Sequence, residues 1–358
     1  MISRITGKNP EYIRNNTKFC GIEPQVAVPN AADEFISGVN AIAEKERKGG
    51  FFSKYFWSPT AIFAGLSLPL LYESLTMIRC RRLKLDGQMQ SLKNLRKHFL
   101  RNMVLYSAAG LGLLQGLQYY FNSNTDKNFA SLKQKFDKIN TKTSSELDEK
   151  TFRSTYKGAY CNSVSGKVFV NKNLINDPIF NTRLDGLLRH ELVHARQFEL
   201  VARSKDGIKK LNYASVIGTV KRAKQSPQTV KEFEDIYNIA VNDTTGKYDN
   251  VNISLSGAEM NFKNYIKAVH ILLNNENATY NDIPVVTDMS HYEKLIAEKG
   301  ALTPEEEEKA NQYFDAIINY SDVSPLNAFN PFGSYRNNVL EKEAYKENQS
   351  WFMRIFNR

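Results

Sequence analysis

Apolar residues in the first third of the chain form two long stretches. Residues 57–78 contain one ionisable side chain, Glu73, and residues 102–121 contain none. Each stretch has about 20 residues, which is enough for a helix to cross a hydrocarbon core of ~30 Å. Aromatic residues gather at their ends, as they do near lipid headgroups. The pattern predicts a transmembrane helical hairpin over 57–121, with a hairpin buried in a soluble domain as the alternative.

Small residues repeat within both stretches at the spacing of a helical turn. Ala108, Gly112 and Gly116 follow one another at four-residue intervals, and Ala61 and Gly65 share that spacing. Small side chains allow membrane helices to approach closely. We therefore expect these residues to form the faces on which the two helices pack.

The pattern changes on either side of the hairpin. Residues 1–56 are a polar amino-terminal segment, and residues 122–150 are polar and predict a linker or a stalk helix. From 151 to 358 a globular domain is expected. Its predicted elements are an alternating, β-branched strand at 167–171 and helices at 183–202, from Ser226–Pro227, at 258–273 and from Thr303–Pro304. These elements predict an α+β fold that is mainly helical.

The net charge of +10 has a local origin. Eight basic residues and a single acid lie between 79 and 101, so this segment alone accounts for most of the excess. A nucleic-acid binder would instead carry its basic residues on the folded domain, so we do not expect that function. The positive-inside rule predicts a basic loop at 79–101 in the cytoplasm, with the globular domain across the membrane. Three scattered cysteines predict no disulfide framework.

The segment with the clearest chemistry is His190-Glu191-Leu192-Val193-His194, inside the predicted helix at 183–202. Residues four apart share one helix face, so both imidazoles can bind the same zinc ion. Glu191 can then take a proton from a water molecule that the metal activates. A third protein ligand is required, and the helix predicted near the carboxyl end, around 335–347, offers several carboxylates.

These motifs resemble those of zincin metallopeptidases of the gluzincin type, whose third ligand is a glutamate on a later helix. Glu341-Lys342-Glu343-Ala344 is similar to the Glu-x-x-Ala segment of membrane-associated zinc peptidases. The resemblance implies Glu341 as the third ligand. An Asp usually follows that ligand by four residues, where this chain has Tyr345, whereas a ligand at Glu343 would have Glu347 in that position. Both glutamates therefore remain candidates.

The resemblance covers residues 160–201 and 335–348 and implies a zincin-like catalytic domain. The strand at 167–171 is then expected to be the sheet edge that pairs with substrate, or else an ordinary core strand. Tyr335 is a candidate donor to the oxyanion, while His270 and His291 are weaker candidates. The expected function is a membrane-anchored zinc endopeptidase acting on proteins or peptides. The alternative is a catalytically inactive zincin-like module that binds a peptide or protein partner.

Overall fold

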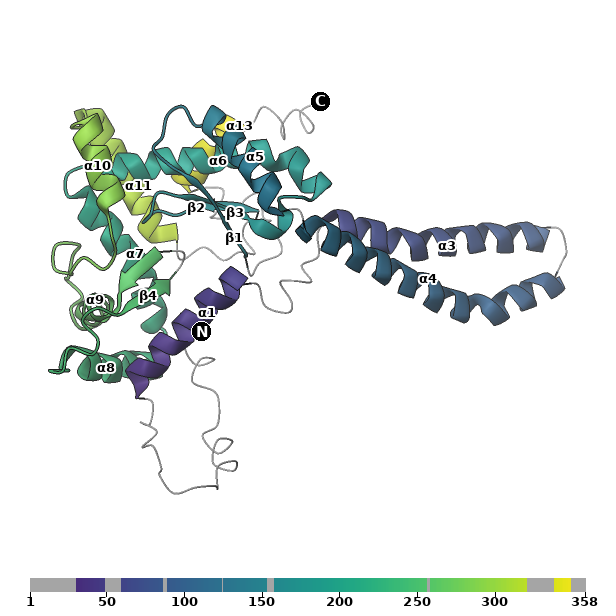
Figure 1. Cartoon of the computed structure of the whole chain (residues 1–358), viewed down its shortest axis with the longest axis horizontal. Coiled ribbons are helices and arrows are strands. Elements are labelled where there is room, and N and C mark those ends of the chain that lie inside the picture. Colours follow the sequence, from purple (N-terminus) through teal and green to yellow (C-terminus); the bar gives the residue numbers. More distant parts are fainter. Residues whose placement is uncertain are drawn as a thin grey trace, which may run out of the picture.

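The computed structural model describes residues 30–48, 59–85, 89–123, 125–152, 158–255, 258–320 and 338–348. Most of these residues are helical (Figure 1). The helices are α1 (Ala31–Lys48), α3 (Pro59–Leu85), α4 (Met89–Ser123), α5 (Thr125–Ile139), α6 (Pro178–Arg203), α7 (Gly207–Ala223), α8 (Pro227–Val241), α9 (Phe262–Asn274), α10 (Ser290–Lys299), α11 (Pro304–Tyr320) and α13 (Val339–Asn348). The mainly helical α+β prediction is therefore confirmed.

A small sheet lies against α6. In the described part of the chain its strands are β1 (Leu147–Lys150), β2 (Ala159–Cys161) and β3 (Val168–Asn171), in the order β1-β3-β2. Strand β3 is parallel to β1, antiparallel to β2 and buried along its whole length. It is therefore the central strand, and the expectation that residues 167–171 form the sheet edge is wrong. Strand β2 forms the edge that borders α6, and β1 arises from the segment predicted as a linker.

Helix α6 begins one turn earlier than the hydrophobic pattern indicates. The side chain of Asp177 accepts a hydrogen bond from the backbone N–H of Phe180, and Pro178 occupies the first helical position. Both features favour a helix start. One side of α6 packs with α5 and the sheet through buried Leu184 and Leu188. Its carboxyl-terminal half packs with α7 and the other helices of a larger core.

The chain before the hairpin belongs to the same folded body as the chain after it. The side chain of Phe35 on α1 is buried against Phe233 of α8 and Phe262 of α9. Asp33 at the start of α1 forms an ion pair with Lys247. The predicted polar amino-terminal segment thus contributes a helix to the domain core.

Two further boundaries differ from the sequence prediction. Ala258–Asn261 form strand β5, which pairs with β4 (Asn252–Leu255), so the helix expected from 258 begins only at Phe262. The side chain of Asn261 caps that helix. The predicted starts at Ser226–Pro227 and Thr303–Pro304 are confirmed by α8 and α11.

Helices α3 and α4 project from the domain as a long antiparallel hairpin (Figure 1). The predicted basic loop at 79–101 is wrong, because α3 continues to Leu85 and α4 starts at Met89. Arg, Lys, Leu and Gln all have high helix propensity, which explains why the basic segment extends both helices.

The two helices meet at a pair of glycines. A β-carbon on Gly110 would clash with the carbonyl oxygen of Gly65, and one on Gly65 would touch Leu114. A β-carbon on Gly112 or Gly116 would meet nothing within 4 Å. The prediction for Gly65 is confirmed, whereas α4 packs through Gly110 and not through the expected small-residue face.

One helix in the described residues, Thr60–Arg82, is long and apolar enough to cross a membrane. Only 11% of its apolar segment is buried, whereas the core helix of a soluble domain is mostly buried. Gln115 and Gln118 lower the hydropathy of the second predicted span, which lies within α4. Among the described residues, the hairpin therefore pairs one candidate span with a second, less apolar helix.

Candidate metal centre

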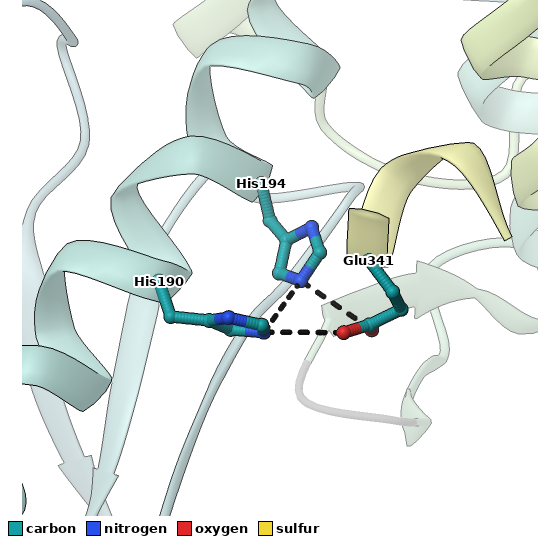
Figure 2. Close-up of side chains that lie close together, drawn as sticks. All are labelled: His190, His194 and Glu341. Carbon is teal, nitrogen blue, oxygen red and sulfur yellow. Dashed lines mark hydrogen bonds and ion pairs between the residues drawn. The ribbon is translucent and has the colours of Figure 1, made fainter. Parts of the chain in front are cut away.

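The two histidines of the motif lie one turn apart on α6. His190 and His194 are both buried, and their side chains point to the same side of the helix (Figure 2). Helix α13 lies against this side of α6, with Leu340 and Ala344 buried at the contact. The packing brings Glu341 to the histidines with only 1% of its surface exposed.

The three side chains present their ligand atoms to one point. The Nε2 atoms of His190 and His194 are 3.1 Å apart. Oε2 of Glu341 lies 3.2 Å from Nε2 of His190, and its Oε1 lies 3.5 Å from Nε2 of His194. Ligands at ~2.0–2.1 Å from a tetrahedral zinc ion are separated by about 3.4 Å, so the spacing fits such an ion.

The amide of Gln197 determines how His194 is oriented. Its Nε2 donates to the carbonyl oxygen of Leu340, at 3.1 Å, and to Glu343. Its Oε1 therefore accepts from Nδ1 of His194, 2.9 Å away. In neutral His194 the proton is then on Nδ1, and the lone pair of Nε2 points towards His190 and Glu341. This arrangement is typical of a metal-binding histidine.

Charge interactions favour an ionised carboxylate at the centre. Burial alone would raise the pKa of Glu341, but hydrogen bonds and charge from His190 and His194 hold it well below its usual range. Burial would lower the pKa of His194, yet the carboxylates of Glu341 and Glu191 raise it above its ordinary value. Nδ1 of His190 is buried and has no hydrogen-bond partner among the described residues, and Oε2 of Glu341 is buried against Nε2 of His190. The group of His190, His194 and Glu341 could hold a metal ion, which would satisfy the carboxylate oxygen.

Glu191 lies beside the centre without belonging to the ligand group. Its Oε2 accepts a hydrogen bond of 2.8 Å from the backbone N–H of Cys161 at the end of β2. Its carboxylate also lines a cavity of about 490 Å³, together with all three grouped side chains. A cavity of this size falls in the range of small-ligand sites. The hydrogen bond to β2 fixes one oxygen of Glu191 and leaves the carboxylate at the cavity wall.

Two tyrosines that the sequence did not indicate also line the cavity. The hydroxyl of Tyr320, the last residue of α11, donates to Oε1 of Glu341 at 3.0 Å. The ring of Tyr345 lies edge-on to His190, with the centroids 4.9 Å apart. Tyr345 follows Glu341 by one helical turn and so shares its face, which spacing alone could have indicated. Tyr320 comes from another helix, and no sequence signal connects it with the site.

The remaining candidates lie elsewhere. Glu343 points to the other side of α13, where it interacts with Tyr313, Lys309 and the amide of Gln197. It is therefore a neighbour of the ligand group and not a member. Tyr335 lies outside the described residues. His270 stacks on Tyr237, and His291 contacts Ser144, so neither joins the described centre.

The chain was also compared with known proteins. No family model, no curated protein and no solved structure matches it. The functional conclusion therefore depends on the residues of this chain alone.

Proposed function

We propose that the protein is a membrane-anchored zinc endopeptidase. One observation supports this proposal most strongly. Two buried histidines and a buried carboxylate lie together, and a second carboxylate, that of Glu191, lies beside them on a cavity wall. Two histidines and one glutamate form a common ligand set of catalytic zinc sites. This geometry agrees with the zincin resemblance of the sequence and favours Glu341 over Glu343 as the third ligand.

His190, His194 and Glu341 would hold the ion. When bound, zinc supplies a Lewis acid that polarises a carbonyl group and lowers the pKa of water. Glu191 takes one proton of the attacking water and passes it to the leaving nitrogen as the C–N bond breaks. Cys161 keeps Glu191 in place through its backbone N–H, and Tyr320 orients the Glu341 carboxylate.

The edge strand β2 favours an extended peptide as substrate. Gly158 accepts from Asn171, and Asn162 donates to Lys167, so these backbone groups face the neighbouring strand β3. Successive residues of a strand alternate in direction, so the backbone groups of Ala159 and Cys161 face away from β3. Both residues line the cavity. Because the N–H of Cys161 donates to Glu191, pairing with a peptide would use the N–H and carbonyl of Ala159 and the carbonyl of Cys161. A peptide that adds to this edge would lie across the proposed centre.

The hairpin supports attachment to a bilayer. Phe63, Leu70 and Leu71 on α3 are each more than half exposed, and apolar side chains of this size are covered by lipid in a membrane. Helices α1 and α5 both belong to the domain, so the hairpin leaves the domain and returns to it on one side of the membrane. The basic residues between 79 and 101 lie at the far end, which we assign to the cytoplasm.

The test uses purified full-length protein loaded with zinc, casein as an unfolded substrate, and the variant Glu191→Gln. We expect casein to be cleaved, cleavage to stop with a chelator, and the variant to lose about 10²–10⁴-fold in rate. The variant should keep its zinc, because Glu191 is not in the ligand group. Undiminished cleavage by Glu191→Gln, or no cleavage by the zinc-loaded protein, would contradict the proposal.

A further inference from the structure

The helix that carries the centre begins at the base of the hairpin. The backbone N–H of Thr60, in the first turn of α3, donates to Oδ2 of Asp177 at 3.0 Å. Its hydroxyl donates to Oδ1 of the same carboxylate at 2.9 Å and accepts from the N–H of Ile179 at 3.2 Å. Asp177 is fully buried and caps α6. These hydrogen bonds connect the start of α3 directly to the start of α6.

The bilayer surface is near this junction. The exposed apolar side chains of α3 begin at Phe63, less than one turn after Thr60. Ile179 is itself a large apolar residue with 38% of its surface exposed, at the hairpin side of the domain. The amino-terminal end of α6 therefore lies close to the lipid that would cover α3.

The length of α6 limits how far the centre lies from the bilayer. At 1.5 Å per residue, His190 is about 20 Å from Asp177 along the helix axis. Any tilt of α6 away from the membrane normal makes the height above the membrane smaller. An extended chain advances ~3.3–3.6 Å per residue, so about six residues cover this distance.

The cavity is elongated along the same helix. The α6 side chains that line it run from Leu187, through the histidines, to Phe198. Strand β2 follows the same direction, because Gly158, just before β2, approaches Phe180 and Leu187 in the amino-terminal half of α6, whereas Cys161 at its end contacts Glu191 further along the helix. A peptide along β2 therefore has one end directed to the base of the hairpin (Figure 1).

We propose that the substrates are polypeptides tethered to the same membrane, hydrolysed at membrane-proximal bonds that lie no nearer to the bilayer than about six residues, the length that an extended chain needs to reach His190. The inference rests on the proposed function. In each turnover one water molecule adds across one peptide bond, giving a new carboxylate and a new amine. The membrane-bound remnant keeps only a short stub.

The test places the full-length protein in liposomes with a single-span substrate. Its stalk, on the side of the catalytic domain, is an unstructured repeat of Gly-Ser-Leu about 30 residues long, so that equivalent bonds occur at every height. Mass spectrometry then locates the cuts. We expect almost no cuts within about six residues of the bilayer, most cuts at roughly 11–16 residues, where the flexible stalk matches the ~20 Å span, and fewer cuts further out. We expect the same repeat as a soluble peptide to be cut at least about tenfold more slowly at equal bulk concentration.

A matched pair of variants tests the junction. Thr60→Val removes the hydroxyl that bonds to Asp177 and Ile179, whereas Thr182→Val removes a hydroxyl whose bond stays within α6. We expect Thr60→Val to spread the cuts towards the distal stalk and Thr182→Val to leave them unchanged. Casein cleavage by both variants should match that of the unmodified protein.

The outcomes separate this inference from the proposed function. Cuts spread evenly over the stalk, or equal rates on the tethered and soluble repeats, would overturn the membrane-proximal substrate class while casein cleavage keeps the endopeptidase. If the zinc-loaded protein cleaves neither casein nor any repeat, the proposed function itself fails.

Discussion

The metal centre and the hairpin depart from ordinary protein surfaces in opposite ways. Glu341 is a carboxylate with 1% of its surface exposed, whereas Phe63 on the hairpin is an aromatic side chain with 74% exposed. Charged groups are normally solvated, and large apolar patches are normally covered. Under the proposed function, a bound cation would compensate the buried carboxylate and lipid would cover the exposed apolar side chains. Because the two regions need different components, removing the metal ion and removing the hairpin should have separate effects.

The largest expected effect is the loss of membrane attachment when the hairpin is removed. In the described residues, neither hydrophobic core contains a side chain from α3 or α4. Replacing residues 59–123 by a short Gly-Ser linker should therefore move the protein completely from the carbonate-resistant pellet to the supernatant. Zinc binding should be kept, because the ligands lie on α6 and α13. A folded variant that remains in the pellet would show that lipid binds elsewhere.

The second effect separates the two glutamates of α13. Glu341→Gln removes a charged ligand, and we expect zinc affinity to fall by more than about 100-fold, since even outer-shell changes cost about 10–100-fold. Glu343 lies one contact further out, because it reaches His194 through Gln197, so Glu343→Gln should cost less than a change in a direct partner of a ligand, below about tenfold. Competition with a zinc-binding dye measures both. A larger loss for Glu343→Gln would contradict the assignment.

Of the three grouped side chains, the sequence predicted both histidines and left the third to a choice between Glu341 and Glu343. The spacing of His190, Glu191 and His194 requires only a helix, and a helix forms there. The choice between Glu341 and Glu343 could not be made, because residues two apart face different sides and the packing of α13 on α6 decides between them. Tyr320 was not predictable, since its contact with Glu341 joins two separate helices.

The same holds for the fold. Features set by residues close together in the sequence were predicted, whereas features set by tertiary contacts were not. Capping residues gave the starts of α8 and α11, because a cap acts within one turn. Strand β1 was missed, because the polar sequence of 122–150 contains few apolar positions and β1 is stabilised by pairing with β3. The central position of β3 likewise depends on its pairing with β1 and β2, and the alternation of apolar and polar residues within β3 does not reveal it.

A third effect concerns stability. Zinc that binds only the folded protein stabilises it by about 4 kcal/mol at a free concentration of 1,000 Kd. Removing the ion with a chelator should therefore lower the midpoint of thermal unfolding by several degrees, and added zinc should restore it. Glu341→Gln should respond little to the chelator, whereas Glu343→Gln should respond like the unmodified protein. An unmodified protein whose midpoint ignores both chelator and zinc would have no ion at this centre.

The smallest effect tests how the hairpin packs. Gly110→Ala introduces a methyl group against the carbonyl oxygen of Gly65, while Gly112→Ala places one where nothing lies within 4 Å. Overpacking of this kind costs about 1–3 kcal/mol, whereas alanine in an open helix position gains up to ~1 kcal/mol over glycine. Thermal unfolding in detergent micelles, followed by helical circular dichroism, should show a lower midpoint for Gly110→Ala only.

The effect of the same two variants can also be measured at one contact between aromatic rings. Tyr72 and Tyr106 stack across the hairpin with their centroids 4.5 Å apart, about one turn from Gly110. If Gly110→Ala separates the helices, this stack opens and the tyrosine signal in near-ultraviolet circular dichroism falls, while Gly112→Ala leaves it unchanged. The reverse result, in which only Gly112→Ala lowers the signal, would mean that α3 and α4 approach each other through the face of Gly112. The packing would then follow the small-residue repeat of the sequence, and the Gly65–Gly110 contact would be wrong.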